Sequence, residues 1–393
     1  MAVKGVFTSD AHIVGDKKGD FASALLQIDP MGTAPMFALT SGMESADATD
    51  TIVNWFEEVL NPGRVGITNN AGTGTSLTVD SGDYVTSGQV YLVETTGEYI
   101  FVASIAGSTA TVERGFAGTT PTAVNGSVTT VYMQRIGSAF EEGSSRPEAI
   151  ANLGYPRFNY MQIFRNSWDL SGTSRQVEYY TTSDRKAKNK KDCANFHAED
   201  IERSLIFGRK TIGTRNSRPF RTMDGVQTQI STNVVSQPGG GMTYASIDNF
   251  LQQVFERNVR GKPNERIAFC GNSVVTTINA LTRATSQMNI QPGVTEFGMK
   301  VMKWMTPFGD ISLMTHPMFV QNPIWTKQLL VLHPGAVRLR YLRRTEEDNN
   351  DRSGAREGRD ADYGVLTTEL TVEYRAERTG GIFTGMDAVA ATP

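Results

Sequence analysis

The chain has 393 residues, of which 39% are hydrophobic and 20% are charged, and its formal net charge is −3. This length exceeds what one hydrophobic core usually serves, so two or three compact units are expected. The small net charge favours neither an acidic nor a basic partner for the chain as a whole.

The two cysteines, Cys193 and Cys270, stand far apart in the sequence. This spacing excludes a paired-cysteine metal site and argues against a disulfide framework, so reduced thiols are expected. Residues Met1–Asp20 lack the continuous apolar stretch of a signal peptide. No apolar run approaches the roughly 18 residues that a membrane helix needs. We therefore expect a protein made in the cytosol that makes no contact with a membrane.

The segment between Arg64 and Arg135 contains no lysine and is rich in threonine and glycine. Alternating runs typical of β-strands recur there, separated by turn signals such as Gly107-Ser108. The runs are Ser76–Asp80, Gln89–Thr95, Glu98–Ile105, Thr109–Arg114 and Ser127–Arg135. They predict a small all-β barrel or sandwich over residues 65–135. The segment has no histidine or cysteine, so its sequence indicates no activity of its own.

Two similar segments flank this β-rich region, DTIVNWFEEVLNPG (Asp50–Gly63) and RIGSAFEEGSSRPEAIANLG (Arg135–Gly154). The first carries Trp55 and Phe56 and the second carries Phe140, and each has a pair of glutamates, which predicts a long hairpin with a domain at its tip. Arms of this kind bury little surface by themselves and are candidates for intermolecular contact. The candidate contact residues are Trp55, Phe56, Phe140, Glu141 and Glu142. The alternative is that both segments are only linkers.

A helix is predicted over residues 183–207, where apolar or buried-type residues recur every four positions. This stripe consists of Cys193, His197, Ile201 and Leu205. The start of the helix is strongly basic, with Arg185, Lys186, Lys188, Lys190 and Lys191. Such a run is either a solvated helix face or a surface that contacts nucleic acid or an acidic arm of a neighbour.

A second α/β region is expected after the flexible QPGGG at residues 237–241. Apolar spacing predicts a helix over residues 247–255, and Asn272 or Ser273 caps the start of another. Between them, Arg266–Cys270 has the pattern of a buried strand. A hairpin turning at Thr306–Gly309 and a strand pair within Leu329–Leu342 follow. After a charged loop at 346–362, alternating residues predict a last long strand.

Residues suited to catalysis are scarce. The four histidines, His12, His197, His316 and His333, are isolated from one another in sequence, and His316 and His333 precede prolines that favour extended backbone. His197 lies on the apolar stripe and is interpreted as a core or interface residue. The chain contains no HExxH, GxSxG or phosphate-loop motif. Accordingly no catalytic, cofactor-binding or metal-binding residue is assigned, and an enzyme is the weaker hypothesis.

The order of these parts resembles the major capsid proteins of tailed bacteriophages with the Hong Kong 97-type fold, an α+β shell fold. The resemblance rests on VNWFEEVL before the β-rich segment, on GEYIFVASIAGSTATVERGFAGTT within it and on FEEG after it. NYMQIFRNSWDLSGT, FGMKVMKWMTPFGDISLMTHPMF and GVLTTELTVEYRAERTGGIFTGM follow in the family's order. By this resemblance, the β-rich segment is a domain inserted in the extended loop of a shell-forming protein.

The resemblance implies a division of the chain. It comprises an N-terminal arm (1–49), extended-loop arms (50–64 and 136–158), an insertion domain (65–135), a peripheral domain (159–236 and 331–393) with a spine helix (183–207), and an axial domain (237–330).

The resemblance also implies a function: self-assembly, in the cytoplasm of a host bacterium, into the icosahedral head shell of the virion around double-stranded DNA. Its partners would be copies of itself, portal and scaffolding proteins, packaged DNA and a decoration protein. Two rivals remain open at this point, an encapsulin-type compartment shell and a secreted adhesin or sugar-binding protein. Some members of the fold join their subunits through a loop lysine, but residues from Gly19 through Arg185 include no lysine. A non-covalently fastened shell is therefore expected.

Overall fold

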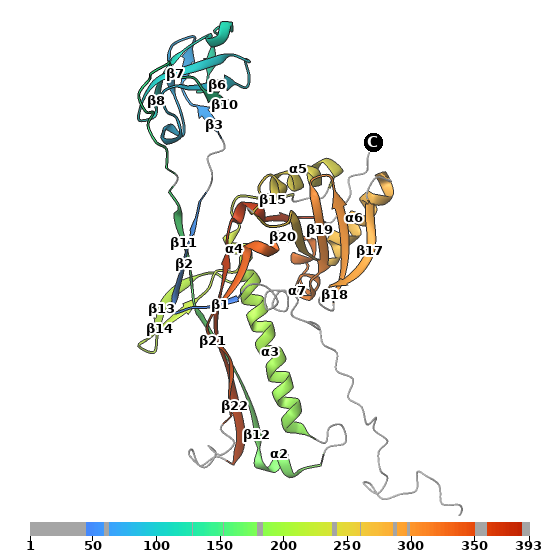
Figure 1. Cartoon of the computed structure of the whole chain (residues 1–393). Helices are drawn as coiled ribbons and strands as arrows, with labels where there is room; N and C mark the ends of the chain where they lie inside the picture. The colour runs from blue at the N-terminus through green and yellow to red at the C-terminus, as the bar shows by residue number, and fades with distance from the viewer. Residues whose placement is uncertain are drawn as a thin grey trace, which may run out of the picture. The chain divides into compact units, whose positions relative to one another are not determined.

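The structure is a computed structural model of the chain. It describes residues 45–58, 63–127, 129–151, 153–178, 184–237, 242–259, 261–285, 289–296, 299–349 and 360–386. Most of the expected N-terminal arm lies outside these residues. The chain forms two compact units, one comprising Phe56–Arg157 and the other the remainder. We describe each unit by itself (Figure 1).

The smaller unit contains an all-β insertion with six strands in one sheet, in the order β3-β10-β6-β7-β8-β5. The strands are β3 (Arg64–Ile67), β5 (Ser76–Thr78), β6 (Gln89–Val93), β7 (Tyr99–Ala106), β8 (Thr109–Glu113) and β10 (Val131–Ser138). A second, two-stranded sheet pairs β4 (Asn70–Gly72) with β9 (Val124–Asn125). The two short helical turns are η1 (Gly82–Tyr84) and η2 (Phe116–Gly118).

The six-stranded sheet closes on itself. A bridge between Ile67 and Val79 joins β3, at one edge, to the residue that follows β5, at the other. The Thr68 amide donates to the Thr78 carbonyl at 2.8 Å, and the Asp80 amide donates to the Gly66 carbonyl at 2.9 Å. Closure leaves no free sheet edge and surrounds a core that includes Ile67, Ile100 and Met133. The expected alternatives of barrel and sandwich thus resolve to a barrel.

The larger unit contains a four-stranded sheet in the order β1-β21-β22-β12. These strands are β1 (Ser45–Asp47), β12 (Gln162–Ser171), β21 (Val337–Asn349) and β22 (Ala361–Tyr374). Helix α3 (Arg185–Phe207) packs on β12 and β22 and begins two residues later than predicted. The Asp184 carboxylate caps the helix by accepting the Ala187 amide hydrogen at 2.9 Å, which explains where it starts.

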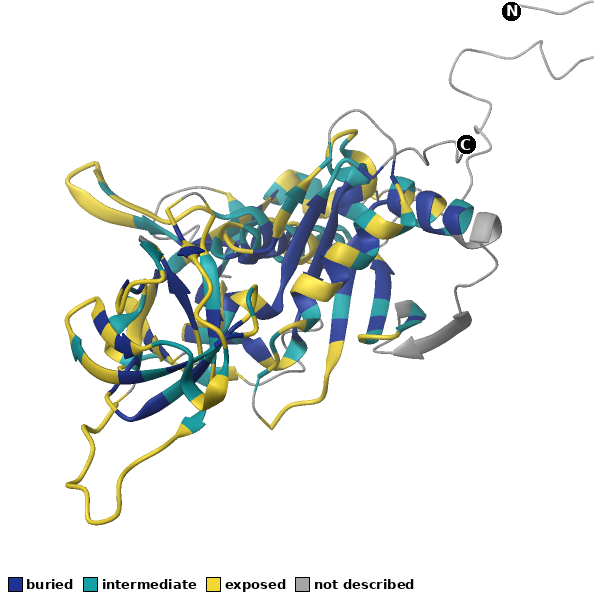
Figure 2. Cartoon of the chain, turned by 90° about the horizontal axis from the view of Figure 1, so that it is seen from above, coloured by how far each residue is buried: buried dark blue, intermediate teal, exposed yellow. Residues whose placement is uncertain are grey.

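A seven-stranded sheet follows the order β15-β23-β20-β16-β19-β18-β17. Its strands are β15 (Val234–Ser236), β16 (Glu265–Cys270), β17 (Asn289–Glu296), β18 (Met299–Thr306), β19 (Gly309–Thr315), β20 (Leu329–Leu332) and β23 (Gly381–Thr384). Helices α5 (Tyr244–Phe255) and α6 (Asn272–Thr285) contribute to the same core as its central strands. Figure 2 shows buried residues concentrated on strands, with exposed residues on outer turns of helices and on loops.

One predicted pairing is wrong. Residues Leu329–Leu342 form two strands, but β20 pairs with β16 and β23, whereas β21 pairs with β1 and β22. The short helical turn η4 (Pro334–Ala336) separates them and directs the chain from one sheet into the other. In addition, β15 and β23 belong to the seven-stranded sheet, although the expected division placed both in the peripheral domain.

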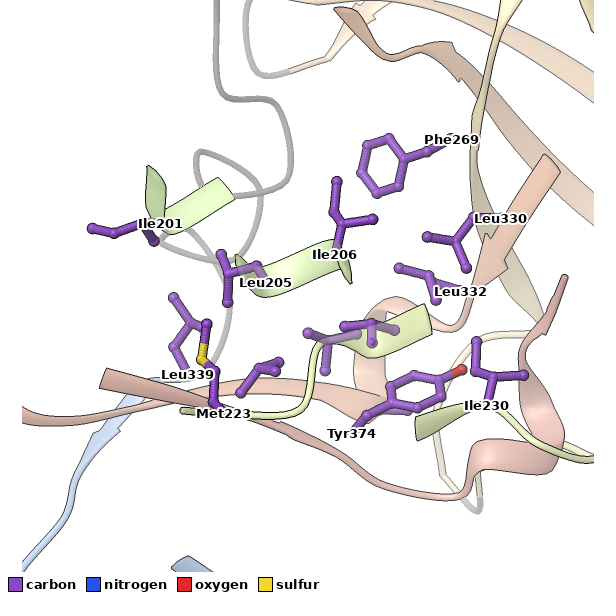
Figure 3. Close-up of a cluster of buried hydrophobic side chains, with 14 of the residues drawn as sticks. Ile201, Leu205, Ile206, Met223, Ile230, Phe269, Leu330, Leu332, Leu339 and Tyr374 are labelled. Carbon is purple, nitrogen blue, oxygen red and sulfur yellow. The ribbon is translucent and has the colours of Figure 1, made fainter. Parts of the chain in front are cut away.

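One buried core connects the two sheets of the larger unit (Figure 3). Ile201 and Leu205 of α3 meet Leu339 of β21, while Phe269 and Leu330 enter from the seven-stranded sheet. The spine helix is therefore fixed to both sheets by apolar burial.

The remaining elements are short. They are β2 (Ile52–Glu57), β11 (Tyr155–Tyr160), α2 (Gly172–Gln176), β13 (Thr211–Arg215), β14 (Arg218–Thr222), α4 (Val226–Gln229), α7 (Pro317–Gln321), η3 (Trp325–Lys327) and η5 (Glu377–Thr379). Strands β2 and β11 pair with each other, as do β13 and β14. The chain leaves the larger unit through β2 and returns to it through β11.

Candidate assembly surfaces

Strand β2 has one buried and one exposed face. Val53, Trp55 and Glu57 are buried, whereas the alternate residues Ile52 and Phe56 are exposed. Trp55 is only 6% exposed and packs with Val53 and Met161. Trp55, a predicted inter-subunit contact, is thus turned by strand alternation toward the chain's own apolar residues.

Phe56, on the opposite face, is 75% exposed. Phe140 is 46% exposed, and its ring also covers Gly88, where a β-carbon would come within 2.3 Å of the ring. Both belong to a set of eight large apolar side chains that stay exposed along the two arms. The set is Ile52, Phe56, Ile136, Phe140, Ile150, Leu153, Tyr155 and Phe158. Each of these side chains is left in water by the subunit itself.

Polar contacts join the two arms where β2 and β11 pair. The Tyr155 hydroxyl donates to Glu57 Oε2 at 3.1 Å, and Arg157 Nε lies 3.8 Å from the same oxygen. Burial, followed by the adjacent Glu57 carboxylate, raises the pKa of Tyr155, so the phenol keeps its proton and remains a donor. The arms are joined by specific contacts, which argues against their being only linkers.

The second glutamate pair lies in an exposed part of the returning arm. Glu141 and Glu142 are exposed, as is every residue up to Ile150, and this stretch contains no helix or strand. Neither carboxylate forms an ion pair with any residue that the structure describes. The pair is therefore available to another molecule.

The basic start of α3 divides into two sets. Lys186 and Lys190, one turn apart, lie over the Trp168 ring at 5.7 and 5.0 Å. Lys186 Nζ is also 3.6 Å from Asp362 Oδ2, and Lys190 Nζ is 3.0 Å from Glu347 Oε1. These two lysines hold the helix to its own sheet, which corrects the prediction that the whole run faces an external partner.

Lys188 and Lys191 do not share this arrangement among the residues that the structure describes. Lys191 is exposed, and Arg185 and Lys188 are partly exposed. Neither Lys188 nor Lys191 has a carboxylate partner among the residues of the described ranges. The candidates for an external contact are therefore fewer than the sequence indicated.

Three histidines have structural roles. His197 is buried, with Asn166 Oδ1 and Thr368 Oγ1 each 2.7 Å from its ring nitrogens, which confirms its core position. His316 Nε2 lies 2.6 Å from Glu202 Oε1, and both side chains are inaccessible to solvent. The ring nitrogens of His316 and His333 also cap α7 and η4, both from extended backbone as predicted. Burial and then the nearby Arg266 lower the pKa of His333 to about 4.

The two cysteines are buried and unpaired. Burial raises the pKa of both thiols, to about 12 for Cys270, so neither forms a thiolate readily. Within the described ranges, no three His, Cys, Asp or Glu residues are grouped closely enough to hold a metal ion. In the same ranges, no helix combines the length and the hydrophobicity required to cross a membrane.

Comparison with known proteins identifies the family to which this chain belongs. A family model described as "SU10 major capsid protein" matches residues 5–387. The chain belongs to this family of major capsid proteins. A major capsid protein of Pseudomonas phage PaMx41 is 28% identical over 402 residues, covering 97% of this chain and 96% of the relative.

Solved structures show a similar fold. A structure from Mycobacterium phage Cain superposes with a TM-score of 0.50 at 8% identity, covering 99% of this chain and 100% of that chain. A Synechococcus elongatus encapsulin covers only 62% of this chain and 79% of its own, with a TM-score of 0.43 at 11% identity. The predicted Hong Kong 97-type fold and the phage capsid assignment are confirmed. The family match over nearly the whole chain decides against both the encapsulin and the adhesin interpretations.

Proposed function

We propose that this capsid protein assembles with copies of itself into the closed icosahedral head shell of a tailed phage, around double-stranded DNA. Assembly takes place in the host cytoplasm, and the mature shell is non-catalytic and non-covalently fastened. The observation that supports this proposal is the set of large apolar side chains that stay exposed along the two arms, because contact with a neighbouring subunit would remove them from water.

Burial of these side chains against a neighbour would contribute to association. Burying one large apolar side chain contributes roughly 1.5–3 kcal/mol. Phe56 and Leu153 are 75% and 88% exposed and so retain most of this free energy for a neighbouring subunit. Every subunit carries these side chains, so a shell repeats the same apolar burial at each contact between subunits.

The test of assembly is electron microscopy of the purified chain, alone and together with the phage's own scaffolding protein. Closed shells of uniform diameter are the expected result. Monomers or open aggregates under both conditions would contradict the proposal. Portal and decoration proteins are further proposed partners that the same particles can be used to test by co-purification.

Packaged DNA is a proposed non-specific partner for the exposed part of α3. Replacing Lys188 and Lys191 with glutamate should preserve empty shells and lower the amount of DNA retained, because it reverses charges that have no carboxylate partner among the described residues. Replacing the same two residues with arginine is the matched control and should retain DNA normally. Equal DNA retention in both variants would show that α3 does not contact the DNA.

A further inference from the structure

Strands β13 and β14 form a cationic ribbon, defined here as residues 209–222, that sequence reasoning did not single out. Five cations lie in this segment, and no aspartate or glutamate does. They are Arg209, Lys210, Arg215, Arg218 and Arg221. The two strands turn at Asn216 and Ser217, whose φ values of 50° and 58° give the tight hairpin (Figure 1).

The ribbon is exposed on both faces. Its strands are mostly solvent-accessible throughout, and Ile212 and Phe220 are 55% and 38% exposed. An isolated two-stranded hairpin is only marginally stable in water. A ribbon that projects from the subunit in this way gains stability when a partner covers it.

The charges of the ribbon are largely unpaired. Lys210 is paired within the unit, its Nζ lying 3.2 Å from Asp224 Oδ2. Arg215 and Arg218 face each other directly across the strands, which places like charges on one face. Neither has a carboxylate partner among the described residues, and Arg215 lies over the Phe220 ring at 5.5 Å. Such a site attracts an anionic partner.

The composition of the ribbon favours a protein over nucleic acid. Arginine and aromatic residues are enriched in protein interfaces, whereas lysine is depleted. The ribbon has four arginines, and its single lysine is the residue already paired internally. Exposed Ile212 and Phe220 also require an apolar covering, which a phosphate backbone does not supply.

We infer that the ribbon binds the returning arm of a second copy of this chain, at Glu141 and Glu142. This inference rests on the proposed self-assembly. The arm around these residues is exposed, has no regular structure, and carries Phe140 next to the acidic pair and Ile150 further along the chain. Acidic and apolar groups on the arm complement basic and apolar groups on the ribbon. Because exposed ion pairs are individually weak and screened by salt, their main effect is on the specificity and rate of assembly.

Charge exchange in trans tests the contact. One variant carries Arg215→Glu and Arg218→Glu, and the other carries Glu141→Arg and Glu142→Arg. The first variant keeps a like-charge pair across the ribbon and loses only the exposed contact of Arg215 with the Phe220 ring, so the stability of the subunit should change little, as thermal unfolding of unassembled subunits will check. Each variant alone should give at least tenfold fewer shells than the wild type, because the altered side chains then carry the same sign as the side chains that they are proposed to contact.

Co-expression of the two variants should restore shells that contain both chains, since each ribbon then finds an oppositely charged arm on the other chain. A contact within one chain cannot be restored by mixing, so absence of rescue would overturn the inference. Normal assembly of the ribbon variant would also overturn it, and a normal shell with less nucleic acid would assign the ribbon to DNA instead. Absence of shells from the wild type would count against the proposed function itself.

Discussion

Glu98 and Arg114 form a buried ion pair at one end of the insertion barrel. Arg114 donates from Nε and Nη2 to the two carboxylate oxygens at 2.8 and 2.6 Å. Glu98 also accepts the amide hydrogens of Gly115 and Thr122, and Arg114 donates to three backbone carbonyls. One pair of side chains thereby holds together several loops that the sequence places far apart.

Replacing Glu98 with glutamine should destabilise the barrel by about 3–5 kcal/mol, because it leaves the Arg114 charge buried without its partner. All four tryptophans belong to the larger unit, so their fluorescence reports that unit alone, while calorimetry reports both. The variant should lower a calorimetric transition that the tryptophan signal does not follow. Glu113→Gln, an exposed change in the same barrel, is the control and should have little effect.

The same pair predicts how stability of the barrel depends on pH. Burial alone would raise the pKa of Glu98, but hydrogen bonds from Arg114, Thr122 and Gly115 outweigh it and lower the pKa below the usual 4.5. A lowered folded-state pKa contributes stability above the unfolded-state pKa and loses it as the pH falls through the folded value. Glu98→Gln should therefore remove part of the barrel's acid sensitivity. An unchanged slope of stability against pH below 4.5 would contradict this assignment.

The strands of the barrel could be predicted from the sequence because their signals are local. Alternation and turn residues gave most of its strands within a few positions, and helix α3 within two residues. Partners distant in sequence were not predictable in this way. The attachment of Lys190 to Glu347 and Trp168, and the division of β20 and β21 between two sheets, depend on tertiary packing that no local pattern encodes.

The cationic ribbon had a local signal that could have been used. Five cations without an acid, placed around a turn-forming Asn-Ser pair, are visible in RKTIGTRNSRPFRT (Arg209–Thr222). The alternation on β2 was also visible, yet which face is buried depends on Met161, more than a hundred residues later. For that reason the sequence identified the arms as a candidate surface but not which aromatic residue is exposed.

Adjacent residues on β2 give a matched pair of variants. Trp55→Ala should lower the stability of the unassembled subunit by about 3 kcal/mol, because it removes the largest member of a small buried cluster. Phe56→Ala should change that stability by less than about 0.5 kcal/mol but reduce the yield of shells. Calorimetry of subunits and microscopy of assembly products measure the two effects. Destabilisation by Phe56→Ala equal to that by Trp55→Ala would show that both faces of β2 are internal.

Considered as a whole, the molecule combines a packed body with surfaces that its own residues leave uncovered. Buried hydrophobic clusters pack against both main sheets of the larger unit, and the barrel has a separate hydrophobic core. The two arms keep eight large apolar side chains exposed, among them Phe56 and Leu153. A shell protein needs both properties, since the body must keep its shape while the arms bind neighbours.

The chemistry needed to cross-link such a shell is absent from the arms. An isopeptide bond requires a lysine amine that can lose its proton, and no lysine occurs from Gly19 through Arg185. Arginine cannot replace it because the guanidinium stays protonated. Disulfides are also disfavoured, since both thiols are buried and their pKa values are raised.

We therefore expect mature particles to come apart completely in hot detergent. Boiling with detergent and reductant should give a single band at the monomer mass of 43.0 kDa. Omitting the reductant should leave the pattern unchanged, because buried thiols in intact particles cannot pair between subunits. A ladder of multimers in both samples would show an isopeptide or similar bond, and a ladder only without reductant would show a disulfide. Either ladder would contradict a shell held by the arms and the ribbon through non-covalent contacts alone.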